Sequence, residues 1–549
     1  MGLRAPLVLG LLVTMLMPPA ASPQQAPAGY DALVALFEQW RAFEKPPLRD
    51  GAPDYSAAAM AAQHEGLRGF QARLKVIDPS GWPIAQQVDY HLVRAEMNGL
   101  DFNHRVLQPW ARDPAFYFSV WPEQSDTPAH EGPTHHEVID LWTYSFPLSA
   151  ADEARLAGEL RTIPPLLRQA RQNLTGNARE LWLTGIGTMQ GQVALLEDLQ
   201  KRTSGAGKAL TGSIADALQS SRDFVAWLEE QAPSKTGPSG IGKENYNWLL
   251  RNVYLIPMTW DDEVRLLRRE LDRAHSSLHL EEQRNRSLPP LAAAATPEEY
   301  ARKADQGATK YLSFLAQNQI MPIWPYMDPA LRAHLGSFVP IEQRNFFQIV
   351  THYEPMALWT HMYHWWDLAR MKEDPNPSPI RRGPLLYNIF AARSEGLATG
   401  VEEMMMHAGL YDDNPRSREV VWIMLAQRAA RGLGSLYVQA NEFTLQQGRD
   451  FHVEWTPRGW MRKDLDLLGF EQQLYLRQPG YGSSYITGKY QIERLLTDRG
   501  HQLGQLGDKF KLSDFFAEMD AAGVIPVSLI RWQLTGKDDE IRALLAGGD

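Results

Sequence analysis

The stretch THYEPMALWTHMYHWWDLAR, residues 351–370, carries three histidines, one glutamate and three tryptophans within twenty positions. From Met356 onward nearly every residue is apolar or aromatic, a pattern that is typical of a helix buried on all sides. Pro355 has no backbone N–H and fits best in a first helical turn, so we expect the helix to begin near Glu354. The stretch therefore predicts a large helical core, and it raises the question of whether its histidines bind a metal.

Most segments from residue 28 to the end place apolar residues three or four positions apart, with few alternating β-branched runs. This spacing indicates helices rather than strands. Three segments rich in Pro, Gly or Ser cannot sustain helices and interrupt the pattern: residues 233–242, 286–297 and 374–384. We therefore expect an all-α fold, a large two-lobed helical protein with a central cleft.

The length of 549 residues is sufficient for two lobes that each bury their own apolar interior. We place the boundary between them near residue 238, inside the first of the helix-breaking segments. The expected parts are a signal peptide at residues 1–22, an N-terminal helical lobe at residues 23–238, and a C-terminal helical lobe with the candidate site at residues 239–549.

The first residues have the order that is typical of a secretory signal peptide. Arg4 precedes an apolar run from about Leu7 to Met17, and small residues follow at positions 20–22. The run is shorter than the roughly 20 apolar residues that a membrane helix needs, and no later stretch reaches that length. We therefore expect an exported protein, periplasmic or secreted, with a cleaved signal peptide and no membrane span.

The composition restricts the partners. A net charge of -10 without any long block of Lys and Arg argues against nucleic acid. The 17 tryptophans indicate aromatic-lined interiors or clefts. Since the chain has no cysteine, we expect no disulfide, no lipid anchor on a cysteine, and metal ligands only from His, Asp and Glu. We expect a small-molecule or peptide substrate, and the sequence does not indicate an oligomeric state.

The spacing of the histidines allows a metal site. His361 and His364 are three residues apart, so they lie on one helical face and could chelate one ion. His352 could join them only if the chain bends at Pro355. Glu354 shares a face with His361 but lies about 10 Å from it along a helix axis, at 1.5 Å per residue. The alternative is that the histidines belong to the core and are satisfied by hydrogen bonds.

A second helix is predicted over RSEGLATGVEEMMMHAGLYDD, residues 393–413. Glu395 and Glu402 are seven residues apart and fall on one face, and Glu403 and His407 form another chelate-spaced pair. Two helices bearing His and Glu can supply the three protein ligands of a zinc site with a fourth position left for water. The alternative is an acidic helix face with the neighbouring methionines in the core.

Three segments of the C-terminal third resemble an uncharacterised family of exported bacterial helical proteins, the domain of unknown function 885. A P-G-Q-A-x-S-Y-x-x-G pattern is matched in QPGYGSSYITGKYQIERLL by Pro479, Gly480, Ser484, Tyr485 and Gly488. An E-G-W-A-x-x-x-E pattern is matched by Glu395, Gly396, Ala398 and Glu402, with Leu397 in place of Trp. The segment GDKFKLSDFFAEMDAAGVIP, residues 507–526, is similar as well, and weaker similarity extends over most of the chain.

The resemblance implies a site like that of a zinc peptidase. Members of the family usually carry H-E-x-x-P-G-H, in which two His and a distal Glu bind zinc and the Glu beside the first His is the general base. The corresponding segment here is HYEPMALWTH, residues 352–361, where Tyr353 separates the first His from the Glu and the P-G pair is missing. The family's roles carry over to Glu395, Glu402 and His361.

The predicted site combines both lines of reasoning. His352, His361, His364 and Glu395 are the expected zinc ligands, Glu354 the proton acceptor, and Tyr485 the donor to a developing oxyanion. We therefore expect an exported metallo-hydrolase that acts on a peptide or amide bond with a zinc-activated water.

The altered motif also favours a second function. A general base that is displaced by one residue loses the hydrogen-bond reach that proton transfer requires. The alternative is therefore a catalytically degenerate member of the family that acts as a periplasmic ligand-binding protein.

Overall fold

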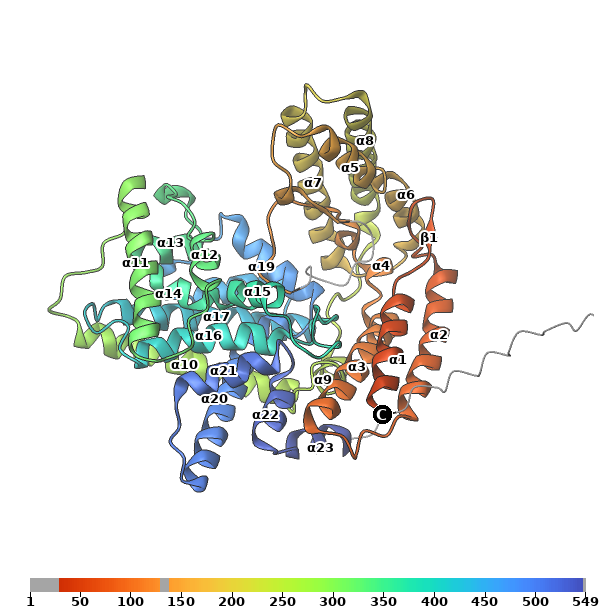
Figure 1. Cartoon of the computed structure of the whole chain (residues 1–549). Helices are drawn as coiled ribbons and strands as arrows, with labels where there is room; N and C mark the ends of the chain where they lie inside the picture. The colour runs from red at the N-terminus through yellow and green to blue at the C-terminus, as the bar shows by residue number, and fades with distance from the viewer. Residues whose placement is uncertain (1–28, 129–137, 547–549) are drawn as a thin grey trace, which may run out of the picture.

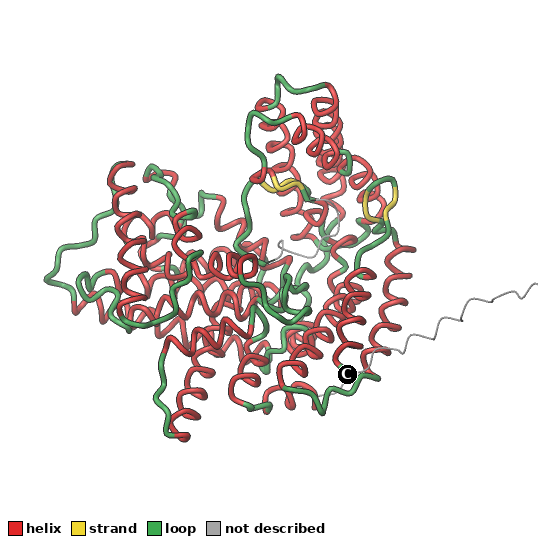
Figure 2. The backbone as a smooth tube through the Cα atoms, in the orientation of Figure 1, coloured by secondary structure: helices red, strands yellow, loops and turns green. Residues whose placement is uncertain are grey.

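The computed structural model describes residues 29–128 and 138–546, and it is mainly helical, as predicted (Figure 2). Within these residues, β1 (Leu48–Arg49) pairs antiparallel with β2 (Ala52–Pro53), and β3 (Val120–Trp121) pairs in parallel with β4 (Ile139–Asp140). The predicted signal peptide lies outside the described residues. In the described part of the chain, no helix is both long and apolar enough to cross a bilayer.

The N-terminal helices form two groups in Figure 1, and one of them projects from the rest of the molecule. The group beside the C-terminal helices consists of α1 (Tyr30–Phe43), α2 (Ala57–Lys75) and α3 (Ile84–Phe102). After the short α4 (Pro109–Arg112), the projecting group consists of α5 (Ala150–Leu160), α6 (Ile163–Asn173), α7 (Arg179–Arg202) and α8 (Lys208–Gln231).

The remaining helices form the larger part of the molecule (Figure 1). They are α9 (Lys243–Asn252), α10 (Trp260–Arg284), α11 (Pro297–Gln317), α12 (Met327–Arg332), α13 (Phe346–Tyr353), α14 (Pro355–Trp359), α15 (Tyr363–Glu373), α16 (Ala391–His407), α17 (Ser417–Gln439), α18 (Leu445–Trp455), α19 (Asp466–Arg477), α20 (Tyr481–Leu506), α21 (Leu512–Ala522), α22 (Val527–Thr535) and α23 (Asp539–Ala546). The three predicted helix breaks are confirmed, since they precede α9, α11 and α16.

Two large hydrophobic cores hold these helices together. The smaller core lies among α5 to α8 and contains Trp182 and Phe224. The larger core joins α1 and α3 to the C-terminal helices and contains Trp40, Trp359 and Ile423. The larger core thus draws on helices from both sides of residue 238, and the domain boundary placed there stays a prediction.

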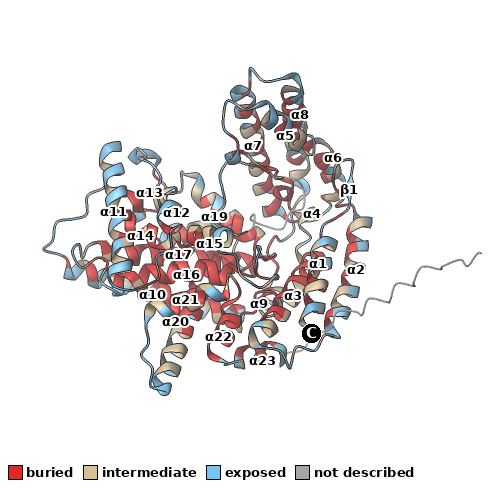
Figure 3. Cartoon of the chain, in the orientation of Figure 1, coloured by how far each residue is buried: buried red, intermediate tan, exposed pale blue. Residues whose placement is uncertain are grey.

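Three helices at the centre of the larger part, α16, α17 and the first half of α20, are buried on nearly all sides (Figure 3). α16 and α20 cross where Gly396 meets Gly488. A Cβ atom built on Gly488 would lie 1.9 Å from the carbonyl oxygen of Ala392 and 2.8 Å from Cα of Gly396. Only glycine permits backbones to approach so closely. The crossing therefore depends on both glycines.

The stretch 351–370 is broken into several pieces instead of forming one continuous helix. α13 ends at Tyr353, and Glu354 adopts non-helical angles of φ -145° and ψ 89° before Pro355 opens α14. A helix does begin after Glu354, whose side chain caps α14 by accepting a hydrogen bond from the backbone N–H of Met356, but this helix ends at Trp359 and does not carry His361 and His364 as predicted. A 3₁₀ turn at Thr360–Met362 then leads into α15.

We expect Gly488→Ala to lower the free energy of unfolding by about 3 kcal/mol, because the new methyl group forces α20 away from the backbone of α16. Urea unfolding followed by far-UV circular dichroism measures the change. The matched control is Gly504→Ala in the same helix, where an added Cβ meets no atom within 4 Å. Alanine there should stabilise the helix by up to about 1 kcal/mol. Equal stability of the two variants would contradict the tight crossing.

Candidate metal centre

Three of the four predicted metal ligands lie together. His361 stands in the 3₁₀ turn, His364 at the start of α15 and Glu395 in the first turn and a half of α16. Oε2 of Glu395 is 3.1 Å from Nε2 of His364 and 3.6 Å from Nε2 of His361. The 3₁₀ turn joins α14 to α15, and the two imidazole rings lie at this junction with centroids 5.0 Å apart.

Each of the three side chains also has a second partner. Nδ1 of His361 is 2.8 Å from Oε1 of Glu402, and Nδ1 of His364 is 2.9 Å from the hydroxyl of Ser394. The hydroxyl of Tyr481 donates a hydrogen bond to Oε1 of Glu395. Partners of this kind orient metal-binding histidines and carboxylates in known sites.

The three side chains fit a zinc ion. One ligand atom from each of His361, His364 and Glu395 lies within 4.8 Å of the others. Ligands at 2.0–2.2 Å in a tetrahedron are roughly 3.3 Å apart, which is close to the two separations measured from Oε2 of Glu395. Two imidazoles and one carboxylate with a free fourth position are the donor set of catalytic zinc. These residues could therefore hold the metal without a large movement.

The metal-free pair of His364 and Glu395 is strongly ionised. Burial alone would lower the pKa of His364, but the charge of Glu395 and its hydrogen bond raise this pKa to about 9. Burial opposes ionisation of Glu395, yet His364 and His361 together hold its pKa well below the usual range. A metal ion would take the place of the imidazolium proton, so binding should release protons.

Glu402 is held by a buried arginine of α17. Nη2 of Arg428 lies 2.6 Å from Oε1 of Glu402, and the arginine is fully buried. Burial lowers the pKa of Arg428, while the carboxylate of Glu402 acts in the opposite direction. Glu402 thus forms ion pairs with both Arg428 and His361, and these pairs link α17 to one of the candidate ligands.

Tyr485 lies beside the centre. Its ring is stacked on that of His361, with centroids 6.0 Å apart and planes 9° from parallel. The guanidinium of Arg431 lies 3.9 Å from the centroid on the same ring. Burial raises the pKa of Tyr485 well above its ordinary value, so its hydroxyl stays protonated and can donate a hydrogen bond.

The structure does not bring His352 and Glu354 to this centre. Nδ1 of His352 is 2.6 Å from the carbonyl oxygen of Gln348, and Nε2 accepts a hydrogen bond from the backbone of Val339. The carboxylate of Glu354 accepts a hydrogen bond from the hydroxyl of Ser417. The bend at Pro355 occurs, but it directs both side chains toward other helices.

The prediction missed several residues of the centre. Tyr481 precedes Tyr485 by four residues, so helical periodicity could have placed both on one face. Nothing in the sequence marks Ser394 as part of the centre except its position beside Glu395. Arg428 could have been noticed, because it interrupts the apolar run VVWIMLAQRAARGLGSL of α17.

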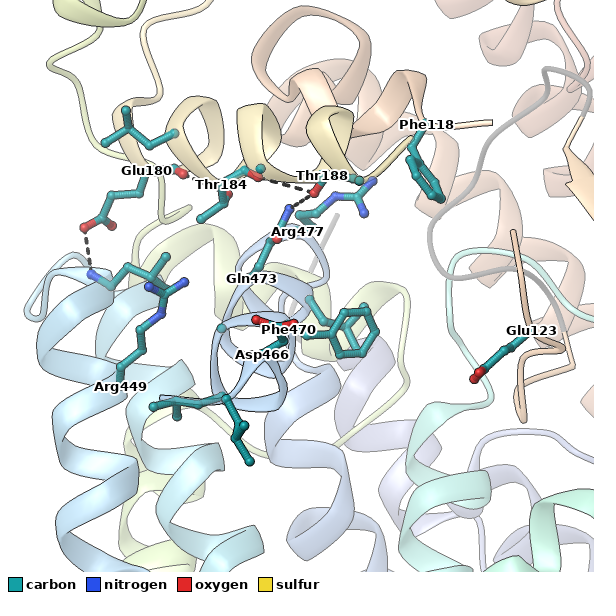
Figure 4. Close-up of a pocket in the computed structure, with 18 of the residues that line it drawn as sticks. Phe118, Glu123, Glu180, Thr184, Thr188, Arg449, Asp466, Phe470, Gln473 and Arg477 are labelled. Carbon is teal, nitrogen blue, oxygen red and sulfur yellow. Dashed lines mark hydrogen bonds between the residues drawn. The ribbon is translucent and has the colours of Figure 1, made fainter. Parts of the chain in front are cut away.

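A pocket of about 1400 Å³ lies between α7 and the pair α18 and α19 (Figure 4). Its wall includes Trp365, the neighbour of His364, and Leu474, which packs in one cluster with Tyr481 and Tyr485. Asp126 lines the pocket as well, and its negative charge helps to raise the pKa of His364.

The sequence matches the profile of the family described as "Bacterial protein of unknown function (DUF885)" over residues 41–335, more than half of the chain. The predicted family is therefore confirmed, and the matched region ends before the candidate centre. No curated protein matches the chain.

Two solved structures share the fold. A protein from Shewanella oneidensis that is described as a lipoprotein of unknown function superposes with a TM-score of 0.67 at 16% identity, covering 92% of this chain and 99% of the other. A protein from Colwellia psychrerythraea that is also described as a lipoprotein superposes with a TM-score of 0.63 at 12% identity, covering 93% of this chain and 99% of the other. At these identities the similarity shows the fold alone.

In the metal-free protein, we expect His364 to stay protonated up to a pH of about 9, as measured by ¹⁵N NMR of labelled histidine. In Glu395→Gln the pKa should fall below the ordinary value near 6.5, because burial is then opposed only by the weaker effects of the charges on Asp126 and Asp367. The folded-state pKa of His364 is raised and that of Glu395 is lowered, so the pair stabilises the fold fully between about pH 4.5 and pH 6.5 and loses this effect as pH rises through about 9.

The matched control is Asp413→Asn, which removes an exposed carboxylate that pairs with Lys310 on the surface. It should leave the titration of His364 unchanged. A pKa of His364 near 6.5 in the unmodified protein would contradict the buried ion pair.

Proposed function

We propose that this member of the DUF885 family is an exported metal-dependent hydrolase that cleaves a peptide or amide bond. One observation carries the proposal: the side chains of His361, His364 and Glu395 lie together, and each of them also contacts a second polar side chain. Buried charged side chains are costly unless they are paired, and such clusters are common at functional sites.

The residues of the centre have distinct roles in this proposal. His361, His364 and Glu395 would hold a zinc ion, while Glu402 and Tyr481 orient them. When bound, zinc supplies a Lewis acid and a water whose pKa is lowered to about 7.

Tyr485 is the candidate donor to the substrate oxygen on which negative charge develops. Its hydroxyl is protonated at neutral pH, because burial raises its pKa. A donor that is already in place stabilises such charge without reorganisation during the reaction.

The proton acceptor differs from that of the family motif. The residue after His361 is Met362, and the carboxylate of Glu354 is held by Ser417, so neither can serve. Asp126 is the better candidate. It is half-buried, lines the neighbouring pocket, and its charge helps to raise the pKa of both His364 and Tyr485.

The proposed location outside the cytoplasm has two supports. The N-terminal segment has the order of a signal peptide, with a basic residue, an apolar run and small residues. The two solved structures named above are described as lipoproteins, a class of exported proteins.

A non-catalytic, ligand-binding function remains the second candidate, and the changed motif favours it. In the described residues, the carboxylate of Glu402 lies 2.8 Å from His361, closer than that of Glu395 at 3.6 Å, and it is engaged by Arg428. If Asp126 does not accept protons, the centre could bind metal and ligand without turnover.

We expect protein purified without chelators or an affinity tag to contain about one zinc per chain by mass spectrometry, and the double variant His361→Ala, Glu395→Ala to contain none. Glu402→Gln should weaken zinc binding by about 10- to 100-fold, because His361 loses its orienting partner. His407→Ala is the control, since this exposed histidine pairs with Glu403 away from the centre.

Zinc that persists in the double variant, or none in the unmodified protein, would contradict the metal centre. A peptide-library cleavage assay then separates the two functions. Cleavage that is lost in Asp126→Asn with zinc retained supports the hydrolase, whereas zinc without cleavage supports the binding protein.

A further inference from the structure

One guanidinium in the pocket between α7, α18 and α19 has no partner. Arg449 on α18 is half-buried, and within the described residues it forms neither a hydrogen bond nor an ion pair. Burial lowers its pKa, and the nearby charge of Glu180 only partly compensates. A desolvated cation of this kind is stabilised by an anion that enters the pocket.

Two other cations of the pocket, Lys463 and Arg477, are already paired with carboxylates. Lys463 lies 2.7 Å from Asp450, and Arg477 lies 2.6 Å from Asp113. Glu180, which faces Arg449 in Figure 4, accepts a hydrogen bond from the backbone N–H of Leu445. The remaining basic residue of the lining, Arg179, is exposed to solvent. Arg449 is therefore the half-buried cation of the described lining that is left to receive an external anion.

The lining favours a carboxylate over a phosphate. It contains four basic and six acidic side chains, and the acidic excess disfavours a dianion. A singly charged carboxylate on an otherwise neutral molecule meets less repulsion.

The walls of the pocket expose large apolar side chains that could contact the side chains of a peptide. Phe470 and Leu183 line it with exposed fractions of 52% and 40%, although they are large and apolar. Thr188 accepts a hydrogen bond from Gln473 across the pocket, so the two walls are held at a definite distance. Apolar walls with a few polar groups are typical of sites that bind small molecules and peptides.

The opposite end of the pocket leads toward the candidate metal centre. Figure 4 shows Glu123 far across the pocket from Arg449, and Asp126 belongs to the same segment. Trp365 and Leu474 connect this end to His364 and Tyr485. A ligand held at Arg449 would therefore extend toward the centre.

We propose that this pocket binds a peptide through one of its carboxylates, with Arg449 as the recognition residue. The idea that the bound peptide is cleaved rests on the proposed function, but recognition by Arg449 does not depend on the metal. The binding test therefore uses protein treated with a chelator.

The probes are N-acetylated Leu-Phe-Leu with a free carboxylate and the same tripeptide as its C-terminal amide. Isothermal titration calorimetry should show that the acid binds about tenfold tighter than the amide, the usual effect of a charge-assisted hydrogen bond. In Arg449→Gln this preference should disappear. Lys463→Gln is the matched control and should keep it, because Lys463 is already paired with Asp450.

A third probe, the amide with aspartate as its last residue, identifies the source of the carboxylate. Tight binding of this probe assigns a side-chain carboxylate, and tight binding of the acid alone assigns the chain terminus. Equal binding of all three probes, or a preference that survives in folded Arg449→Gln, would overturn the proposal. Absence of zinc from the native protein would overturn the hydrolase but not this binding site.

Discussion

The close approach of α16 and α20 at Gly396 and Gly488 is the contact on which the candidate centre depends. Glu395 directly precedes one glycine, and Tyr485 and Tyr481 lie one and two turns before the other. The hydroxyl of Tyr481 reaches Glu395 only because the two backbones touch. A side chain at either crossing point would separate the carboxylate from the tyrosine that orients it.

Several buried ion pairs lie around this crossing, although apolar side chains could fill the same space. Arg428 supports Glu402, and Arg431 pairs with Glu471 beneath the ring of Tyr485. Replacing buried ion pairs by apolar residues is often neutral or stabilising, so stability alone gives little reason to keep them. Their arrangement instead orients the imidazoles and the tyrosine hydroxyl, which supports a functional site rather than a set of core histidines.

Part of the centre follows from local rules that the sequence displays. The spacing of His361 and His364 indicated a common face, and Glu402, seven residues after Glu395, indeed points to the same cluster. The position of His352 could not be predicted from such rules. Its two ring nitrogens are used by Gln348 and Val339, and the second of these contacts depends on a loop that no spacing rule places.

By itself, the sequence determined the helical class, the breaks between helices and the residue types available as metal ligands, because periodicity, proline and glycine act over a few neighbouring residues. Only the tertiary structure decided which of these side chains meet. Asp126, His364, Glu395 and Tyr485 come from segments far apart in the chain. Their convergence depends on the 3₁₀ turn after α14 and on the glycine crossing, which are properties of packing between helices rather than of any one helix.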